Sequence, residues 1–381
     1  MRSVGTLAIT LLTLSTLSTL ITQPVHAETR TVCVDGGCDF TTIQSAIDAA
    51  ADGDVIEIAA GTYLIGQTID TVGKAITLRG SVDSETGETL TILDGQGLHR
   101  VLQCLSGEGQ DTVFNGLLIQ NGLAPLTDYF SDGNPTENRL GGGVLIRNSS
   151  PVLSNCILRN NRADGGWGGG LFGGSANDGI SEPTFIKCTF TDNSARHGGG
   201  MYNYRSSPTL TDCTFTNNSV NSSGGGMFNY YSSSPTLNNC TFTNNSAVYY
   251  GGGMYNGGSS PTLTNCTFTD NYAAEYGGGM SNSSSSSPTL TETTVCENSP
   301  DQIRGGYNDN GGNCVGADCD QCECTADLDG DGDVGGSDLT QLLADWGCSG
   351  ADCTGDINDD GLVDGEDLTV ILSSWNSCPK S

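Results

Sequence analysis

The chain of 381 residues carries 44 acidic side chains against 14 basic ones, and its formal net charge is −30. This excess of negative charge argues against a nucleic-acid partner, because phosphate binding requires the opposite sign. With 55 Gly and 16 Cys, the chain is expected to fold largely into turns and short strands.

The first 27 residues have the features of an export signal. Arg2 precedes an apolar, Thr-rich run at residues 4–21, and Val25, His26 and Ala27 fit the small-residue rule for cleavage. We therefore expect residues 1–27 to be removed and the mature protein to be secreted or displayed at the cell surface. A single-span anchor is the alternative, and no later segment is apolar enough to cross a bilayer.

Residues 28–54 are predicted to form an N-terminal cap. Apolar residues at helical spacing would cover the open end of a larger body. They are Ile43, Ala46, Ile47 and Ala50. Cys33 and Cys38 are expected to close a small loop there, and strand is expected to begin at Val55.

From about residue 140 the chain repeats itself every 25 to 32 residues. Each repeat contains a proline, and in five of them a cysteine follows five positions later; a run of three glycines also recurs. The prolines are Pro151, Pro183, Pro208, Pro235, Pro261 and Pro288, and the cysteines are Cys156, Cys188, Cys213, Cys240 and Cys266. Such spacing predicts stacked units that bury a shared core.

Within one repeat, "SPTLTNCTFTNN" and "GGGMYN" offer three short β-prone pieces and no room for a helix. We predict an all-β fold, a right-handed parallel β-helix over residues 55–299 with three strands per coil. A left-handed bend at the Asn or Asp before most of the cysteines would turn both Leu210 and Phe215 inward. The triple glycines would form tight corners; a phosphate-cradling loop is the alternative.

Two motifs carry a resemblance to known families. "GGGM" together with F-x-x-N, as in Phe215–Asn218, resembles the repeat of polymorphic outer-membrane proteins, a family of β-helical surface proteins that includes adhesins. "DFTTIQSAIDAAADGDVIEIAAGTY" at residues 39–63 is similar to the entry of pectin-lyase-like right-handed β-helices. The resemblances cover residues 33–299 and imply either a binding surface or a polysaccharide lyase or hydrolase. The carboxy-terminal membrane barrel of the first family is absent from this sequence.

Two sets of side chains on the coils are candidates for function. The five repeat cysteines are predicted to stay buried as free thiols, although export would permit disulfides. If the Met after each glycine run faces inward, the next residue faces outward and forms an aromatic stripe able to stack on sugar rings. This predicted ligand-binding stripe is Phe172, Tyr202, Phe228 and Tyr255. An aromatic ladder that only covers the scaffold is the alternative.

A catalytic site would need a basic proton acceptor with calcium-binding carboxylates, or two facing carboxylic acids. Charged residues of both kinds gather around two irregular segments, residues 123–140 and 173–182, which would wall a groove. The candidates are Asp128, Asp132, Arg139, Arg159, Arg162 and Asp164. No spacing among them is diagnostic.

Near the C-terminus, "DLDGDGDVGGSD" (327–338) and "DINDDGLVDGED" (356–367) place oxygen ligands at positions 1, 3, 5 and 12, with Gly at 6. This spacing predicts two calcium sites, because a hard cation requires such a set of oxygens. The first set is Asp327, Asp329, Asp331 and Asp338, with the Asp333 carbonyl. The second set is Asp356, Asn358, Asp360 and Asp367, with the Leu362 carbonyl and Asp364 through water.

Each loop leads into an apolar-periodic helix, and the duplicated loop–helix unit resembles dockerin type I modules. The resemblance implies calcium-dependent folding of residues 324–381 and docking to a cohesin-like or other scaffold domain. Positions 10 and 11 depart from the usual hydroxyl pair, which puts a standard cohesin partner in doubt. They are Gly336 and Ser337, then Gly365 and Glu366.

Residues 300–323 are predicted to be a Cys-rich linker. We expect disulfides in the module, involving Cys324, Cys348, Cys353 and Cys378, while "CDQCEC" offers zinc ligation as the alternative. The prediction for the whole chain is an exported β-helix that binds carbohydrate or a cell-surface component, with a polysaccharide lyase or hydrolase as the alternative.

Overall fold

A computed structural model describes residues 27–126, 139–175, 179, 181–319, 326–330, 334–350, 353–358 and 360–375. The predicted signal at residues 1–27 therefore lies almost wholly outside the described residues. No helix of the described chain combines the length and apolarity needed to cross a bilayer.

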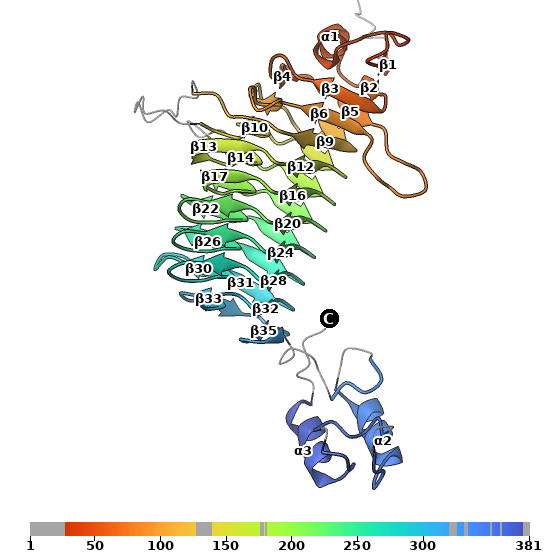
Figure 1. Cartoon of the computed structure of the whole chain (residues 1–381), viewed down its shortest axis with the longest axis vertical. Helices are drawn as coiled ribbons and strands as arrows, with labels where there is room; N and C mark the ends of the chain where they lie inside the picture. The colour runs from red at the N-terminus through yellow and green to blue at the C-terminus, as the bar shows by residue number, and fades with distance from the viewer. Residues whose placement is uncertain are drawn as a thin grey trace, which may run out of the picture.

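The body is a stack of coils whose strands form three long parallel sheets (Figure 1). Sheet 1 has 11 strands. They are β1 (Thr29–Val32), β2 (Val55–Ile58), β5 (Thr77–Gly80), β8 (Val113–Asn115), β11 (Val152–Ser154), β15 (Thr184–Ile186), β19 (Thr209–Thr211), β23 (Thr236–Asn238), β27 (Thr262–Thr264), β31 (Thr289–Thr291) and β34 (Asn308–Asp309).

Sheet 2 follows sheet 1 in each coil and has 10 strands. They are β3 (Gly61–Leu64), β6 (Thr91–Asp94), β9 (Leu117–Gln120), β12 (Ile157–Arg159), β16 (Thr189–Thr191), β20 (Thr214–Thr216), β24 (Thr241–Thr243), β28 (Thr267–Thr269), β32 (Thr294–Cys296) and β35 (Cys314–Val315). Because β33, β34 and β35 pair onto the preceding coil, the paired strands run past the predicted boundary at residue 299.

Sheet 3 closes the coil and has nine strands. They are β4 (Ile69–Asp70), β7 (Leu102–Cys104), β10 (Val144–Arg147), β14 (Leu171–Gly174), β18 (Met201–Tyr204), β22 (Met227–Tyr230), β26 (Met254–Gly257), β30 (Met280–Asn282) and β33 (Ile303–Arg304).

The expected three strands per coil are joined by a fourth, short one in five coils. This short sheet lies between sheets 2 and 3 along the chain. Its strands are β13 (Arg162–Trp167), β17 (Ser194–His197), β21 (Ser219–Val220), β25 (Ser246–Ala247) and β29 (Tyr272–Ala273). Its alanine and valine side chains form a small core of their own.

The core consists of columns of like residues, one from each coil. The inward Leu of sheet 1 and Phe of sheet 2, such as Leu210 and Phe215, are both fully buried as predicted. The bend between them uses a left-handed residue before each cysteine, for example Asp212 with φ +55°. Lys187 stands where the other coils of the cysteine column have Asn or Asp, and it also adopts this conformation, with φ +52°.

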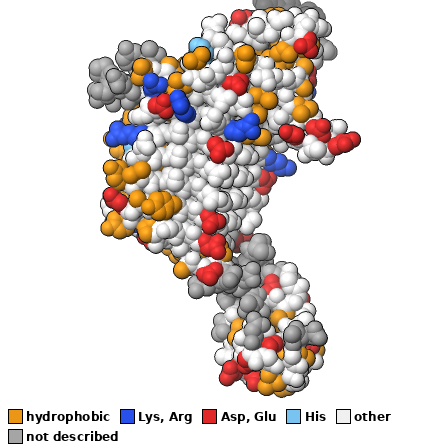
Figure 2. Space-filling model, in the orientation of Figure 1, with side chains coloured by type: hydrophobic (Ala, Val, Ile, Leu, Met, Phe, Trp, Pro, Cys, Tyr) orange, Lys and Arg blue, Asp and Glu red, His pale blue; other side chains and the backbone are white. Residues whose placement is uncertain are grey.

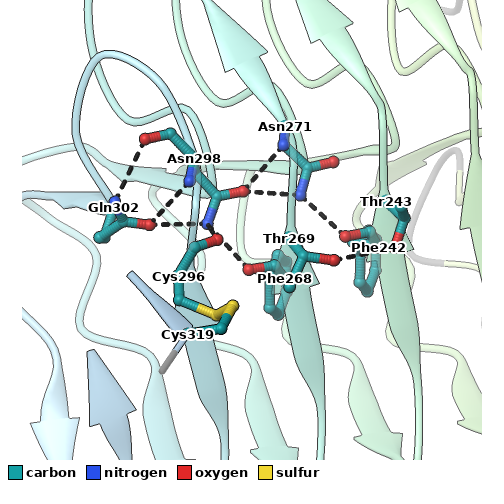
Figure 3. The surroundings of a disulfide bond; sticks show 9 residues. All are labelled: Phe242, Thr243, Phe268, Thr269, Asn271, Cys296, Asn298, Gln302 and Cys319. Carbon is teal, nitrogen blue, oxygen red and sulfur yellow. Dashed lines mark hydrogen bonds between the residues drawn. A yellow bond between two sulfur atoms is a disulfide. The ribbon is translucent and has the colours of Figure 1, made fainter. Parts of the chain in front are cut away.

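The cysteine column is buried and free of disulfides, as predicted. Burial raises the pKa of the Cys188 thiol well above its usual range. A second buried column is asparagine: Asn161, Asn193, Asn218, Asn245, Asn271 and Asn298. Each of its neighbouring pairs shares amide hydrogen bonds, shown for Asn271 and Asn298 in Figure 3.

The triple glycines form tight corners, as predicted. A side chain at Gly168, which has φ +70°, would place its Cβ 2.3 Å from the Leu171 carbonyl oxygen. The N–H groups of Gly168, Gly169 and Gly170 donate to carbonyls of the next coil. The phosphate-cradling alternative is therefore wrong here, because these donors are already used.

The N-terminal end is capped by α1 (Ile43–Ala49), which buries Ile43, Ala46 and Ile47 against the first coils. A disulfide joins Cys33 to Cys38, as predicted. Cys296 and Cys319 form a second disulfide beside the asparagine column (Figure 3). Since Cys319 is bridged, it is not available for the alternative zinc site.

Beyond the last coil, α2 (Gly336–Ala344) and α3 (Gly365–Ser373) form a small helical module (Figure 1). Its core is made of Ala326, Val334, Leu342, Val363 and Ile371. Cys348 and Cys353 form the expected kind of bridge, while Cys324 and Cys378 lie outside the described residues.

Candidate ligand-binding site

Three residues of the predicted aromatic stripe are buried, so the expectation of an exposed stripe is wrong for them. Phe172, Tyr202 and Phe228 do point out of sheet 3, but their exposed fractions are 0%, 3% and 6%. The residues just before each glycine run fold over them. Trp167 stacks on Tyr202 with ring centroids 5.5 Å apart, and His197 meets Phe228 edge-on at 4.8 Å.

The fourth residue, Tyr255, is only partly buried and joins a set of accessible tyrosines. It stacks on Phe228 at 4.7 Å and on Tyr250 at 6.3 Å. The set includes tyrosines at the ends of sheet 3 strands and tyrosines just before the glycine runs. We call it the tyrosine band. Its members are Tyr204, Tyr230, Tyr231, Tyr250, Tyr255 and Tyr276.

The rings of the tyrosine band remain partly exposed to solvent. Tyr231 is 51% exposed, and its ring lies 5.6 Å from Tyr204 and 5.4 Å from Tyr230. Burial raises the pKa of Tyr255. Its hydroxyl therefore stays protonated near neutral pH and can donate a hydrogen bond.

Two adjoining hollows lie along the band. One, of about 380 Å³, is lined by Tyr230, Tyr231, Ser232, Tyr255, Gly257, Gly258, Ser283 and Ser285. The other, of about 530 Å³, shares Tyr231 and Ser232 with it. Its remaining lining residues are Gly179, Ser181, Glu182, Arg205 and Ser207. Gly179, Ser181 and Glu182 thus bring the described part of residues 173–182 to this hollow, while most of the other predicted wall, residues 127–138, lies outside the described residues.

Beside the first hollow, a glycine takes the place of a tyrosine in the column of residues that end the strands. Tyr204, Tyr230 and Gly257 occupy the same register on successive strands of sheet 3. A Cβ at Gly257 would lie 2.9 Å from the Tyr230 ring and 3.1 Å from the Tyr255 ring. The two rings therefore already occupy the position that a side chain at Gly257 would take, and the hollow lies beside them.

A guanidinium group marks each end of the band. Arg205 lies over Tyr204 and Tyr231 at 5.6 and 5.1 Å, and Arg304 lies over Tyr276 at 3.7 Å. Cation–π contacts of this kind attract the guanidinium to the ring face. Serine side chains and tyrosine rings line both hollows, and Arg205 lines the second one.

Sequence reasoning missed Tyr204, Tyr230 and Tyr231. They end or follow the strands "MYNY" and "MFNY", three and four positions after the Met. An inward Met makes the third position after it outward, so alternation alone could have identified Tyr204 and Tyr230.

The predicted catalytic residues do not converge on one described site. Asp128 and Asp132 lie outside the described residues. The Arg159 guanidinium donates to Gln120 at 2.6 Å, Arg162 pairs with Asp164 at 3.3 Å, and Arg139 donates to the Ala124 carbonyl.

A cavity of about 420 Å³ does lie beside part of this group. Its lining includes Asp94, Asn121, Asn160 and Arg162. The Asp94 carboxylate accepts hydrogen bonds from the Gln120 and Asn121 amides, both at 2.9 Å.

In the first acidic loop, three of the predicted ligands lie close together. Carboxylate oxygens of Asp327, Asp329 and Asp338 lie within 4.8 Å of one another and could hold a metal ion. Asp331 and Asp333 lie outside the described residues. Asp338 accepts from the backbone N–H groups of Leu328, Asp329 and Gly335.

The second loop repeats the backbone hydrogen bonds of the first. Asp367 accepts from Ile357, Asn358 and Asp364 N–H groups at 2.8 to 3.1 Å. Asp356 accepts from the N–H groups of Asp360 and Gly361. Desolvation would raise the pKa of Asp338 and Asp367, but the backbone donors outweigh it and lower both pKa values.

These oxygens fit a hard divalent cation. Carboxylate and carbonyl ligands on a loop that turns at Gly are the set that calcium prefers. The remaining predicted ligands, Leu362 at position 7 and Asp364 at position 9, lie on the same turn, where Asp364 also caps α3.

Comparison with known proteins addresses the β-helix. A family described as "Right handed beta helix region" matches residues 114–255 and 173–320, which together span more than half of the chain. The chain belongs to this right-handed β-helix family. Membership confirms the predicted handedness. No curated protein matches the chain.

Solved structures resemble this β-helix at low sequence identity. A pectin methylesterase from carrot is 12% identical, with a TM-score of 0.48, and the match covers 74% of this chain and 87% of the other. Pectate lyase Pel9A is 12% identical, with a TM-score of 0.47 and 88% coverage of both chains. A tailspike from an Acinetobacter baumannii bacteriophage, a capsular polysaccharide depolymerase, is 13% identical, with a TM-score of 0.40, and covers 76% and 62%. These likenesses concern the fold, and we transfer no functional residue from them.

Proposed function

We propose that this right-handed β-helix protein is exported and binds polysaccharide through its tyrosine band. The observation that carries the proposal is the hollow of about 380 Å³ that is lined by Tyr230, Tyr231 and Tyr255 together with serine hydroxyls. Sugar rings stack on tyrosine, and their hydroxyl groups pair with serine and arginine. Disulfides at Cys33–Cys38 and Cys296–Cys319 support an oxidising, extracytoplasmic location.

Calorimetric titration of the full chain with a polysaccharide panel tests this proposal. We expect Tyr231→Ala to weaken binding about tenfold, because an aromatic anchor removed from a binding site typically costs more than 1 kcal/mol. Tyr272→Ala is the matched control, since Tyr272 is 52% exposed but belongs to the short sheet, outside the band. Equal losses in both variants, or no binding by the wild type, would overturn the proposal.

A second candidate function is polysaccharide cleavage at the cavity beside Asp94. It is favoured by a carboxylate, amides and the Arg162 guanidinium lining one space of about 420 Å³. Reducing-end and unsaturated-uronate assays over the same panel distinguish the two functions. Turnover that disappears in Asp94→Asn and Arg162→Gln would favour the enzyme, and binding without turnover would favour the adhesin-like function.

For residues 324–381 we propose a calcium-dependent docking module. The two loops hold equivalent carboxylates, and each helix presents an exposed Leu and Trp at equivalent positions. These are Leu343 and Trp346 on and just after α2, and Leu372 and Trp375 on and just after α3. A cohesin-like or other scaffold domain is the partner that such a module would bind.

Limited proteolysis of the full chain tests the module. Calcium is expected to slow cleavage within residues 324–381, and a chelator is expected to restore it. An Asp338→Ala, Asp367→Ala double variant should be cleaved at the same rate with and without calcium. Protection of that variant by calcium, or no protection of the wild type, would contradict the assignment.

A further inference from the structure

Sheet 2 presents a regular array of threonines on its outer face. Four consecutive strands, β16, β20, β24 and β28, each carry two outward threonines in exact cross-strand register. We call these eight residues the threonine field. They are Thr189, Thr191, Thr214, Thr216, Thr241, Thr243, Thr267 and Thr269.

The field is flat. The Phe rings directly beneath it stack with centroid separations of 4.5 to 4.6 Å and interplanar angles of 1°. These rings belong to Phe190, Phe215, Phe242 and Phe268. Adjacent strands in most sheets are rotated by about 20–25°. Because these strands are related almost by translation alone, the threonines form a straight lattice with a second spacing of about 6.6 Å along each strand.

The field is uncharged, and most of its hydroxyls are available. The Thr243 and Thr269 hydroxyls share a hydrogen bond of 3.2 Å (Figure 3). Within the described chain, no hydrogen bond uses the side chains of Thr214, Thr216, Thr241 or Thr267. The space-filling view shows a mostly uncoloured area over these strands, so charged and hydrophobic side chains are scarce on it (Figure 2).

The fold does not require threonine at these positions. In earlier coils of the same sheet, the same two columns hold Ile157 and Arg159, then Leu118 and Gln120. Those strands pair equally well in parallel. The threonines of the later coils are therefore a property of the surface and not of the scaffold.

We propose that the threonine field binds ice. A rigid, flat and periodic array can match only a partner that is itself flat and periodic. Threonine offers a hydroxyl that can replace a lattice water and a methyl group that favours burial from liquid water. A mineral surface would call for charged side chains, and a crystalline polysaccharide for aromatic rings; the described field has neither.

Ice-affinity partitioning and thermal hysteresis of the full chain test the proposal. The wild type should enter growing ice and show hysteresis. Thr241→Tyr, at the centre of the field, should lose both, because its ring would lift the flat surface away from the crystal. Thr216→Tyr in the neighbouring strand should do the same.

Thr62→Tyr is the matched control, because Thr62 is an exposed threonine of β3 in the same sheet but outside the field. This variant should retain ice binding, and circular dichroism should show that all the variants are folded. Exclusion of the wild type from ice would overturn the proposal. So would wild-type activity in folded Thr241→Tyr, or binding to crystalline cellulose or chitin in place of ice.

Discussion

Replacing Asn245 by Ala should strongly destabilise the coil stack. The Asn245 amide donates to the Phe215 carbonyl and to Asn271 Oδ1, both at 2.9 Å. Its Oδ1 accepts from the Asn218 backbone N–H at 3.1 Å and from the Asn218 side chain at 2.9 Å. Alanine removes all four bonds and leaves the Asn218 N–H without its acceptor in a buried column.

The magnitude follows from the kind of bonds that are lost. An unpaired buried N–H costs about 1–3 kcal/mol, and the other three lost bonds about 0.5–1.5 kcal/mol each. We therefore expect the free energy of unfolding to fall by about 4 kcal/mol. Denaturant unfolding followed by circular dichroism measures this change as a shift of the midpoint at constant slope.

The neighbouring Asn244 provides a matched control. It is exposed, has φ +56°, and its side chain forms no hydrogen bond within the described chain. Glycine tolerates this conformation, so Asn244→Gly should change stability by no more than about 0.5 kcal/mol. If Asn245→Ala cost less than about 1 kcal/mol, or if both variants cost the same, the reasoning about the asparagine column would be refuted.

Two further predictions concern buried groups. His197 is largely enclosed, its Nδ1 has no hydrogen-bond partner in the described chain, and desolvation together with nearby Arg196 lowers its pKa from 6.5 to about 4. Between these two pKa values the unfolded chain binds a proton that the native chain does not. The free energy of unfolding of the wild type should therefore fall by about 2 kcal/mol relative to that of His197→Gln between pH 7.5 and 5.0. Denaturant titration at each pH measures this change, and parallel stability profiles of the two proteins would contradict the prediction. Six thiols of the described chain, including Cys104 and Cys213, are buried and free. They should react with a thiol reagent only after denaturation, and disulfides found within the column by mass spectrometry would disprove this.

Much of the fold could be predicted from the sequence, because each coil repeats the same local choices. The bend before each cysteine, the inward Leu and Phe, and the glycine corners all follow from spacing and residue type. The short sheet was missed because strands such as β21, with two residues, carry no recognisable periodicity. Its existence depends on pairing with the next coil.

The candidate site was harder to predict for a different physical reason. Strand alternation correctly indicates that Tyr202 and Phe228 leave sheet 3 on the outer side. It does not indicate that Trp167 and His197, which precede the glycine corners, fold back across those rings. Contacts between coils therefore determine which outward aromatic side chains are exposed to solvent. Tyr255 stays partly exposed, as do Tyr230 and Tyr231 at the strand ends.

In this β-helix, the residues that stabilise the fold and the residues that determine its surface properties occupy different columns. Inward columns of Leu, Phe, Met, Cys and Asn recur with little change, and a substitution in one coil disturbs its contacts with the coils on both sides. Outward columns are free to differ along the same sheet, as Arg159 and Thr191 do on adjacent strands. A charged region, a threonine field and a tyrosine band can therefore occupy separate parts of one scaffold, and variants in one of them should leave the properties of the others unchanged.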